Sequence, residues 1–131
     1  MVIEKGMKRI IEYVVREDDS PRFLLEKGIG ILSTPRMIQL MEANAKALID
    51  ENIDPEHTSV GIHVDVYHKA PAPVGAKVVF EAVVEEVKGR KILFRVTCRM
   101  GDIVVGEGIH ERAIVPWEKF KEHVKKICES V

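Results

Sequence analysis

The sequence is short of cysteine, of long apolar runs and of any excess of charge. Its two cysteines, Cys98 and Cys128, lie far apart and form no CxxC or Cys/His ligand spacing, so we expect two reduced thiols. With 20 basic and 21 acidic residues the formal net charge is -1, and the basic residues are scattered. Charge alone therefore gives no reason to expect a nucleic-acid or membrane surface.

No apolar run approaches the roughly 18 residues that cross a membrane, and the N-terminus lacks the layout of a signal peptide. We therefore expect a cytosolic protein. The chain has 131 residues, of which 46% are apolar and 31% charged, as is typical of one globular domain. We expect a single domain over residues 1–131, with a core over about 7–115 and a C-terminal helix over about 116–130.

The stretch STPRMIQLME at residues 33–42 predicts the start of a long helix, which we expect over about residues 35–50. Thr34 and Pro35 offer a cap and a first turn. At 100° per residue the apolar side chains span an arc of about 200°, which a curved sheet covers better than a single helix. Glu42 lies at the edge of this arc and Asn44 near its middle.

Segments before and after this helix carry the pattern of β-strands. They are residues 7–15, 59–70, 76–87, 91–100 and 102–115. The third and fourth are joined at Lys88–Gly89, a hairpin turn. Strands joined by tight turns pair antiparallel, and one long apolar helix against one antiparallel sheet is an α+β layout. Only one sheet face is covered, so we expect self-association.

Two of these strands carry informative alternation. In residues 59–70, Val60 and the alternate apolar residues after it share a face with His68, which places Gly61 on the other face. In the last strand Gly106 and Gly108 share one face, so we expect the helix or a neighbouring strand to approach closely there.

Two segments lie outside this core pattern. Ser20 and Pro21 can cap a short helical turn that Gly28 ends. The C-terminal helix has an apolar stripe at helical spacing with lysines opposite, and we expect this stripe to dock on the domain. The stripe consists of Trp117, Phe120, Val124 and Ile127.

The stretches TPRMIQLME, TSVGIHVDVYHKAPAPVG and HERAIV resemble the hot-dog fold thioesterase superfamily, in particular its fluoroacetyl-CoA thioesterase-like branch. The resemblance covers about residues 7–115. It implies an antiparallel sheet wrapped around one long central helix. It also implies hydrolysis of an acyl-CoA, expected to carry a short acyl group, by a homodimer or a dimer of dimers with no metal or other cofactor.

The resemblance also implies roles for particular residues. The catalytic Thr/Glu/His trio of that branch matches Thr34, Glu42 and His68, and two substrate-pocket residues match Gly61 and Arg112. Residues 16–30 match the lid segment of that branch by no firm motif, which leaves the acyl group open.

Each trio residue also has a structural interpretation. Thr34 either caps the helix or presents its hydroxyl at a helix N-terminus, where free N–H groups favour a developing negative charge. Glu42 is either a base or the partner of Lys46 at i,i+4. His68 is either a proton shuttle or a core-edge histidine bonded to the backbone.

Helix geometry separates two members of the trio. Thr34 and Glu42 are eight residues apart, which is roughly 12 Å along the axis and about 80° around it. One helix therefore cannot easily bring both to a single carbonyl. Either water or His68 bridges them, or one group comes from a second subunit.

The remaining polar residues favour simpler interpretations. A buried Asn44 must be hydrogen-bonded, to the loop or to the glycine-bearing strand, and we expect it to be structural. His63 and His110 share no spacing that would chelate a metal. Two rival functions are a non-catalytic acyl-CoA or acyl-ligand binding module and a hot-dog dehydratase. The dehydratase would use an Asp/His pair, but Asp65 lies on the strand face opposite His68.

Overall fold

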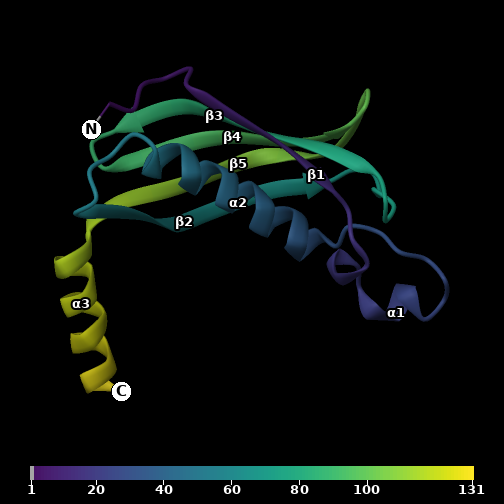
Figure 1. The fold of residues 1–131 in the computed structure, drawn as a ribbon. Helices are drawn as coiled ribbons and strands as arrows, with labels where there is room; N and C mark the ends of the chain where they lie inside the picture. Colours follow the sequence, from purple (N-terminus) through teal and green to yellow (C-terminus); the bar gives the residue numbers. More distant parts are fainter. Residues whose placement is uncertain (1) are drawn as a thin grey trace.

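The chain folds into one antiparallel sheet that curves around a long helix (Figure 1). The computed structural model describes residues 2–131. Its elements are β1 (Lys8–Val14), a 3-10 turn (Glu17–Asp19), α1 (Arg22–Leu25), α2 (Thr34–Asp50), β2 (His57–His68), β3 (Lys77–Lys88), β4 (Lys91–Met100), β5 (Ile103–Pro116) and α3 (Trp117–Ser130). The predicted α+β layout and hot-dog fold are confirmed.

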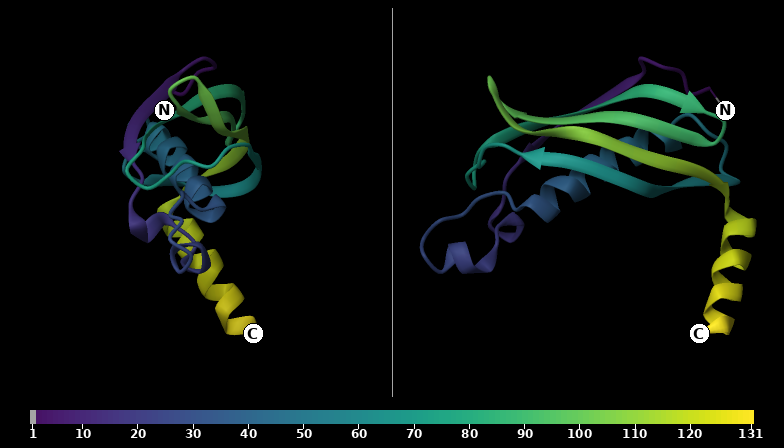
Figure 2. Two further views of the ribbon diagram at one scale, coloured as in Figure 1. Left: turned by 90° about the vertical axis from the view of Figure 1, so that its right-hand side faces the viewer. Right: turned by 180° about the vertical axis from the view of Figure 1, so that it is seen from behind.

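The sheet has the strand order β1-β3-β4-β5-β2, and every neighbouring pair is antiparallel. β1 and β2 are therefore its two edge strands. The predicted hairpin at Lys88–Gly89 is confirmed, since Lys88 pairs with Lys91 and Gly89 has a φ of +60°. Figure 2 shows α2 lying along the concave face, with the segment before it gathered beyond one end of the sheet.

The wide apolar arc of α2 fills the concave face, as predicted. Its buried side chains pack against the inward residues of the sheet, which include Phe80 and Phe94 at 0% exposure. The buried apolar residues of α2 are Met37, Leu40, Met41, Ala45, Leu48 and Ile49. Burial of this surface is the main source of stability of the fold.

The predicted alternation of β2 is interrupted by a β-bulge. The register against β5 shifts between Gly61 and His63, so that Ile62 is an extra residue. The alternation therefore reverses at this point. Gly61 shares the helix-facing side with His68, and the prediction that grouped Val60 with His68 was wrong.

The close approach predicted at the two glycines of β5 is confirmed for both neighbours. A Cβ on Gly106 would lie 2.5 Å from the sulfur of Met37 in α2. A Cβ on Gly108 would collide with the backbone of Asp65 and Val66 in β2. Both positions therefore need glycine because the helix and the edge strand lie so close.

The docking predicted for the C-terminal helix was wrong. Figures 1 and 2 show α3 projecting away from the end of the sheet, and none of its side chains is buried. Trp117 is 43% exposed and Ile127 is 51% exposed. α2 already fills the concave face, so the stripe meets no free apolar surface on its own chain. Within the described residues, every helix is too short or too polar to cross a membrane.

Asn44 connects α2 to β1 and not, as predicted, to a loop or to β5. Its Nδ2 donates to the carbonyl of Arg9 at 3.0 Å, and its Oδ1 accepts from Arg9 Nη1 at 2.9 Å. Asn44 is 2% exposed, so both bonds replace hydration that the amide loses on burial.

We expect Asn44→Ala to lower the free energy of unfolding by about 1–3 kcal/mol, because it leaves the Arg9 carbonyl without a partner. Chemical denaturation measures this change. The matched control is Glu51→Ala, which removes only the exposed ion pair to Arg9 and should cost less than about 1 kcal/mol. Equal losses in the two variants would contradict a structural role for the amide.

Candidate active site

A threonine and a histidine from different elements meet at the N-terminus of α2. Thr34 is the first residue of α2 and His68 is the last residue of β2. Thr34 Oγ1 lies 2.7 Å from His68 Nδ1, within hydrogen-bonding distance. Thr34 itself is exposed, so its hydroxyl can be reached from solvent.

The interpretation of Thr34 as the helix cap was wrong. Ser33 is the cap, and its Oγ accepts from the N–H of Arg36 at 3.2 Å. The capping position thus belongs to the residue before the threonine. The hydroxyl of Thr34 is left free for His68.

Backbone pairing around the site explains why the two side chains meet. The segment entering α2 runs alongside the segment leaving β2: Leu32 donates to the carbonyl of Ala72 at 2.9 Å, and Ile31 forms a bridge with Pro73. The APAP stretch of residues 70–73 ends β2 and turns the chain back along this path. Main-chain contacts just before Thr34 and just after His68 therefore bring the two side chains together.

The N-terminus of α2 offers few free N–H groups. Pro35 has none, and the N–H groups of Arg36 and Met37 both bond to Ser33. Within residues 2–131, only the N–H of Thr34 remains at this terminus for a substrate oxygen. The helix dipole adds a favourable field for negative charge at the same place.

His68 is suited to accept a proton. Burial lowers the pKa of His68 below its ordinary value of 6.5, so the ring is neutral near pH 7. Its Nε2 is buried and has no hydrogen-bond partner within residues 2–131. A buried nitrogen without a partner is costly, and such atoms concentrate at functional sites.

A second polar cluster lies further along the concave face, around Gly61. A Cβ on this glycine would be 3.3 Å from Arg112 Nη1 and 3.7 Å from Glu42 Oε2. Glu42 is half-buried, and the interpretation that it pairs with Lys46 was wrong because Lys46 bonds Asp50 at 2.6 Å. Glu42 and Arg112 therefore both lie close to Gly61, where there is little room for a larger side chain.

Arg112 is only 5% exposed, and hydrogen bonds hold its guanidinium in place. Its Nε donates to Ser59 Oγ at 2.8 Å and its Nη2 to the Ser59 carbonyl at 3.0 Å. Its Nη1 lies 3.2 Å from His110 Nε2. Burial lowers the pKa of Arg112, and the charge of Glu42 opposes that shift.

Within one chain the predicted trio is thus divided. Thr34 and His68 form one pair, while Glu42 lies eight residues further along α2 with Gly61 and Arg112. The helical rise makes this separation roughly 12 Å, as the sequence predicts.

Sequence reasoning missed three members of these clusters. Ser59 carried no signal because the bulge reverses the face to which it belongs. His110 stands two residues before Arg112, so both point inward from β5, and this polar pair on a buried strand face was a usable signal. Asp19, in the segment before α2, is 3% exposed and had no pattern around it that indicated burial.

Asp19 anchors the segment before α2. It accepts from the Tyr13 hydroxyl at 2.6 Å and from Arg36 Nε at 2.9 Å. Burial alone would raise the pKa of Asp19, but the hydrogen bonds from Tyr13, the Arg16 backbone and Arg36 outweigh it and leave that pKa lowered. This ion pair fixes the segment to the first turn of α2, next to Thr34.

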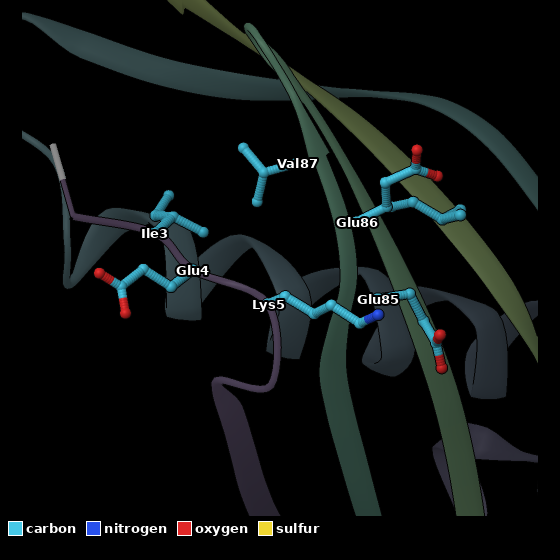
Figure 3. Close-up of a pocket in the computed structure, with 7 residues that line it drawn as sticks. Ile3, Glu4, Lys5, Glu85, Glu86 and Val87 are labelled. Carbon is cyan, nitrogen blue, oxygen red and sulfur yellow. The ribbon is translucent and has the colours of Figure 1, made fainter.

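A separate hollow of about 580 Å³ lies between the N-terminal segment and the β3–β4 hairpin (Figure 3). Its lining contains none of the predicted site residues and no histidine, serine, threonine or cysteine. The lining residues are Ile3, Glu4, Lys5, Glu85, Glu86, Val87 and Leu93. The residues predicted for the site therefore lie outside this hollow.

Known proteins share this fold and part of this sequence. A family model described as fluoroacetyl-CoA-specific thioesterase matches residues 15–118. The fluoroacetyl-CoA thioesterase of Streptantibioticus cattleyicolor is 32% identical over 96 residues, which cover 73% of this chain and 69% of that protein. A solved structure of the fluoroacetyl-CoA thioesterase FlK superposes with a TM-score of 0.86 at 27% identity, over 96% of this chain and 98% of that chain.

A thioesterase superfamily member from Thermus thermophilus also shares the fold. It superposes with a TM-score of 0.87 at 24% identity, over 98% of this chain and 96% of that chain. Together with the matches above, this fold defines a hot-dog thioesterase, a hydrolase of acyl-CoA thioesters. The chain belongs to the fluoroacetyl-CoA-specific thioesterase family, as the sequence resemblance predicted.

We expect the ring of His68 to titrate below pH 6.5, because burial disfavours its charged form. As the pH falls from 7, the neutral ring should therefore persist beyond the point at which an ordinary histidine is protonated. NMR titration of the ring protons measures the midpoint, and the spectrum of His68→Ala assigns the signal. A midpoint at or above 6.5 would contradict the burial that the structure shows.

Proposed function

We propose that the chain hydrolyses acyl-CoA thioesters through Thr34, His68 and Glu42. The observation that carries this proposal is the 2.7 Å contact between Thr34 Oγ1 and His68 Nδ1, at a helix N-terminus and beside a buried, unpartnered Nε2. A hydroxyl next to a neutral imidazole is an activated nucleophile, and it can equally hold a water molecule for the same attack.

Thr34, His68 and water can account for every bond and proton in the hydrolysis. His68 takes the proton from the attacking oxygen, that oxygen bonds the carbonyl carbon, and the C–S bond breaks as the thiolate of CoA takes up a proton. If Thr34 is the nucleophile, a water molecule then hydrolyses the acyl-threonine ester. The products are the free acid and CoA. The dipole of α2 and the N–H of Thr34 favour the negative charge on the carbonyl oxygen during attack.

We propose that Glu42 acts as a base in a site completed by a second copy of the chain, in a homodimer or a dimer of dimers. Glu42 cannot easily reach the Thr34–His68 pair on its own helix, as the rise between them is roughly 12 Å. β2 is an edge strand, and it carries exposed apolar groups. These groups are Ile62, Val64 and Tyr67.

We also propose that the substrate carries a short acyl group and that the protein is cytosolic. The relative named for fluoroacetyl-CoA supports a short acyl chain and makes that ester one member of the panel to test. Arg112 and Gly61 would line the acyl end of the pocket. Cys98 and Cys128 are both free thiols, which supports a cytosolic protein.

We expect free-thiol release from one or more members of a panel of short to long acyl-CoAs. Thr34→Ala, Glu42→Ala and His68→Ala should each lower kcat by about 10²-fold or more, because each removes a proton-transfer or nucleophilic group. Asp65→Ala is the matched control, since Asp65 lies on the same strand with its side chain on the opposite face, and it should retain activity.

Two outcomes would overturn this proposal. Wild-type rates in both Glu42→Ala and His68→Ala would exclude the trio. Acyl-CoA that raises the melting temperature of the wild type without any release of thiol would favour the non-catalytic binding module. A loss of activity in Asp65→Ala equal to that of His68→Ala would instead favour Asp/His chemistry.

The shared site can be tested by mixing two inactive variants. If Glu42 acts across the dimer, a mixed dimer of Thr34→Ala and Glu42→Ala chains contains one complete site. Unfolding and refolding the two variants together should then recover about a quarter of wild-type activity, given random pairing. Each variant refolded alone is the control. Mixed dimers that form but stay inactive would place the whole trio within one chain.

A further inference from the structure

Arg112 is a buried arginine that forms no ion pair with a carboxylate in the described part of the chain. Arg9 and Arg36 each bond a carboxylate, at 3.1 Å and 2.9 Å. Among the ion pairs of residues 2–131, none includes Arg112. Its three hydrogen bonds go to Ser59 and His110, both uncharged, so its positive charge is not neutralised by a direct partner.

The contacts of His110 fix its protonation state. Its Nδ1 lies 2.8 Å from the carbonyl of His63, which only accepts, so Nδ1 carries the proton. Its Nε2 lies 3.2 Å from Arg112 Nη1, which only donates, so Nε2 is unprotonated. Both contacts require the same neutral ring. Burial lowers the pKa of His110, which agrees with that state.

The surroundings hold this ring in one orientation. His110 is 1% exposed, and it stacks on Phe94 with centroids 6.5 Å apart and planes at 25°. The carbonyl that anchors Nδ1 belongs to His63, the residue that follows the bulge at Ile62. Bulges leave backbone groups aimed away from the regular ladder. The bulge thus supplies the acceptor that selects the less common imidazole tautomer.

We propose that His110 is a positioning residue of the thioesterase. Its neutral ring, protonated on Nδ1, accepts a hydrogen bond from Arg112 at Nε2. This bond leaves the remaining guanidinium N–H groups directed at the acyl end of the substrate beside Gly61. A guanidinium has five N–H donors, and three are used, so two remain. Glycine at position 61 keeps Nη1 uncrowded, since a Cβ there would lie only 3.3 Å away. This inference rests on the acyl-CoA hydrolysis proposed above.

Because the imidazole of His110 is neutral, it orients Arg112 without forming an ion pair with it. An aspartate or glutamate at the same place would orient the guanidinium equally well, but it would cancel the charge that attracts the substrate oxygen or another electronegative acyl atom. The imidazole lone pair orients the group and leaves the charge in place. His110 therefore acts through Arg112 and need not touch the substrate.

Three variants separate positioning from packing. His110→Asn keeps a donor for the His63 carbonyl but loses the acceptor for Arg112, and His110→Phe keeps only the ring that stacks on Phe94. His110→Gln can place an amide oxygen where Nε2 lies. We expect kcat/KM for the preferred acyl-CoA to fall about tenfold or more in the Asn and Phe variants, and to recover in the Gln variant.

The affinity for free CoA is the control, because CoA has no acyl group for Arg112 to contact. Calorimetric binding of CoA should be the same in the wild type and all three variants. Full kcat/KM in His110→Asn would overturn the proposal. So would a parallel loss of CoA binding and kcat/KM in all three variants, since that pattern indicates a distorted fold.

NMR of the wild-type protein tests the tautomer without any substrate. Long-range ¹H–¹⁵N spectra should show His110 protonated at Nδ1 and unprotonated at Nε2 near pH 7. A ring protonated at Nε2 would overturn the proposal even in an active enzyme. The correct tautomer in a protein that hydrolyses no acyl-CoA would instead refute the proposed function, and with it the catalytic part of this inference.

Discussion

The packing of α2 into the concave face of the sheet is the interaction on which the other features depend. It needs a helix that is apolar over more than half its circumference, and it leaves little room for polar groups. Each polar side chain of α2 that turns inward must therefore have a defined partner or a function. Asn44 has a partner in Arg9. Glu42 has no such partner within residues 2–131, and it lies near Gly61 and the buried Arg112.

Much of the fold was predictable because it depends on periodicity. The long helix, the strands after it, the hairpin and the glycines of β5 all follow from local patterns that tertiary packing reinforces. The bulge at Ile62 was not predictable, since one extra residue changes the pairing without changing the hydrophobic pattern. The orientation of α3 was not predictable either, because its stripe shows that the helix is amphipathic and not what covers it.

For the candidate site, the structure tests the predicted geometry and only part of it follows from the sequence. Thr34, Glu42 and His68 were found by their motifs, and the helical rise correctly separated the first two. Two of the simpler interpretations were wrong for one reason: a neighbouring residue took the role. Ser33 caps the helix in place of Thr34, and Asp50 pairs with Lys46 in place of Glu42. The choice between such alternative partners depends on contacts that a pattern does not specify.

The arginines differ in burial and in ion pairing, and this difference shows where a buried charge destabilises the fold. Arg9 and Arg36 retain about 30% and 28% side-chain exposure and have carboxylate partners, whereas Arg112 is 5% exposed and has none. A buried cation without a counter-ion is expensive, so nearby hydrogen bonds must offset that cost. Such energetically unfavourable groups persist at functional sites, where an unpaired charge or hydrogen-bonding atom can interact with the substrate. Arg112, which has no direct ion-pair partner, and the Nε2 of His68, which has no hydrogen-bond partner within residues 2–131, are two such groups, and the proposed reaction would use both.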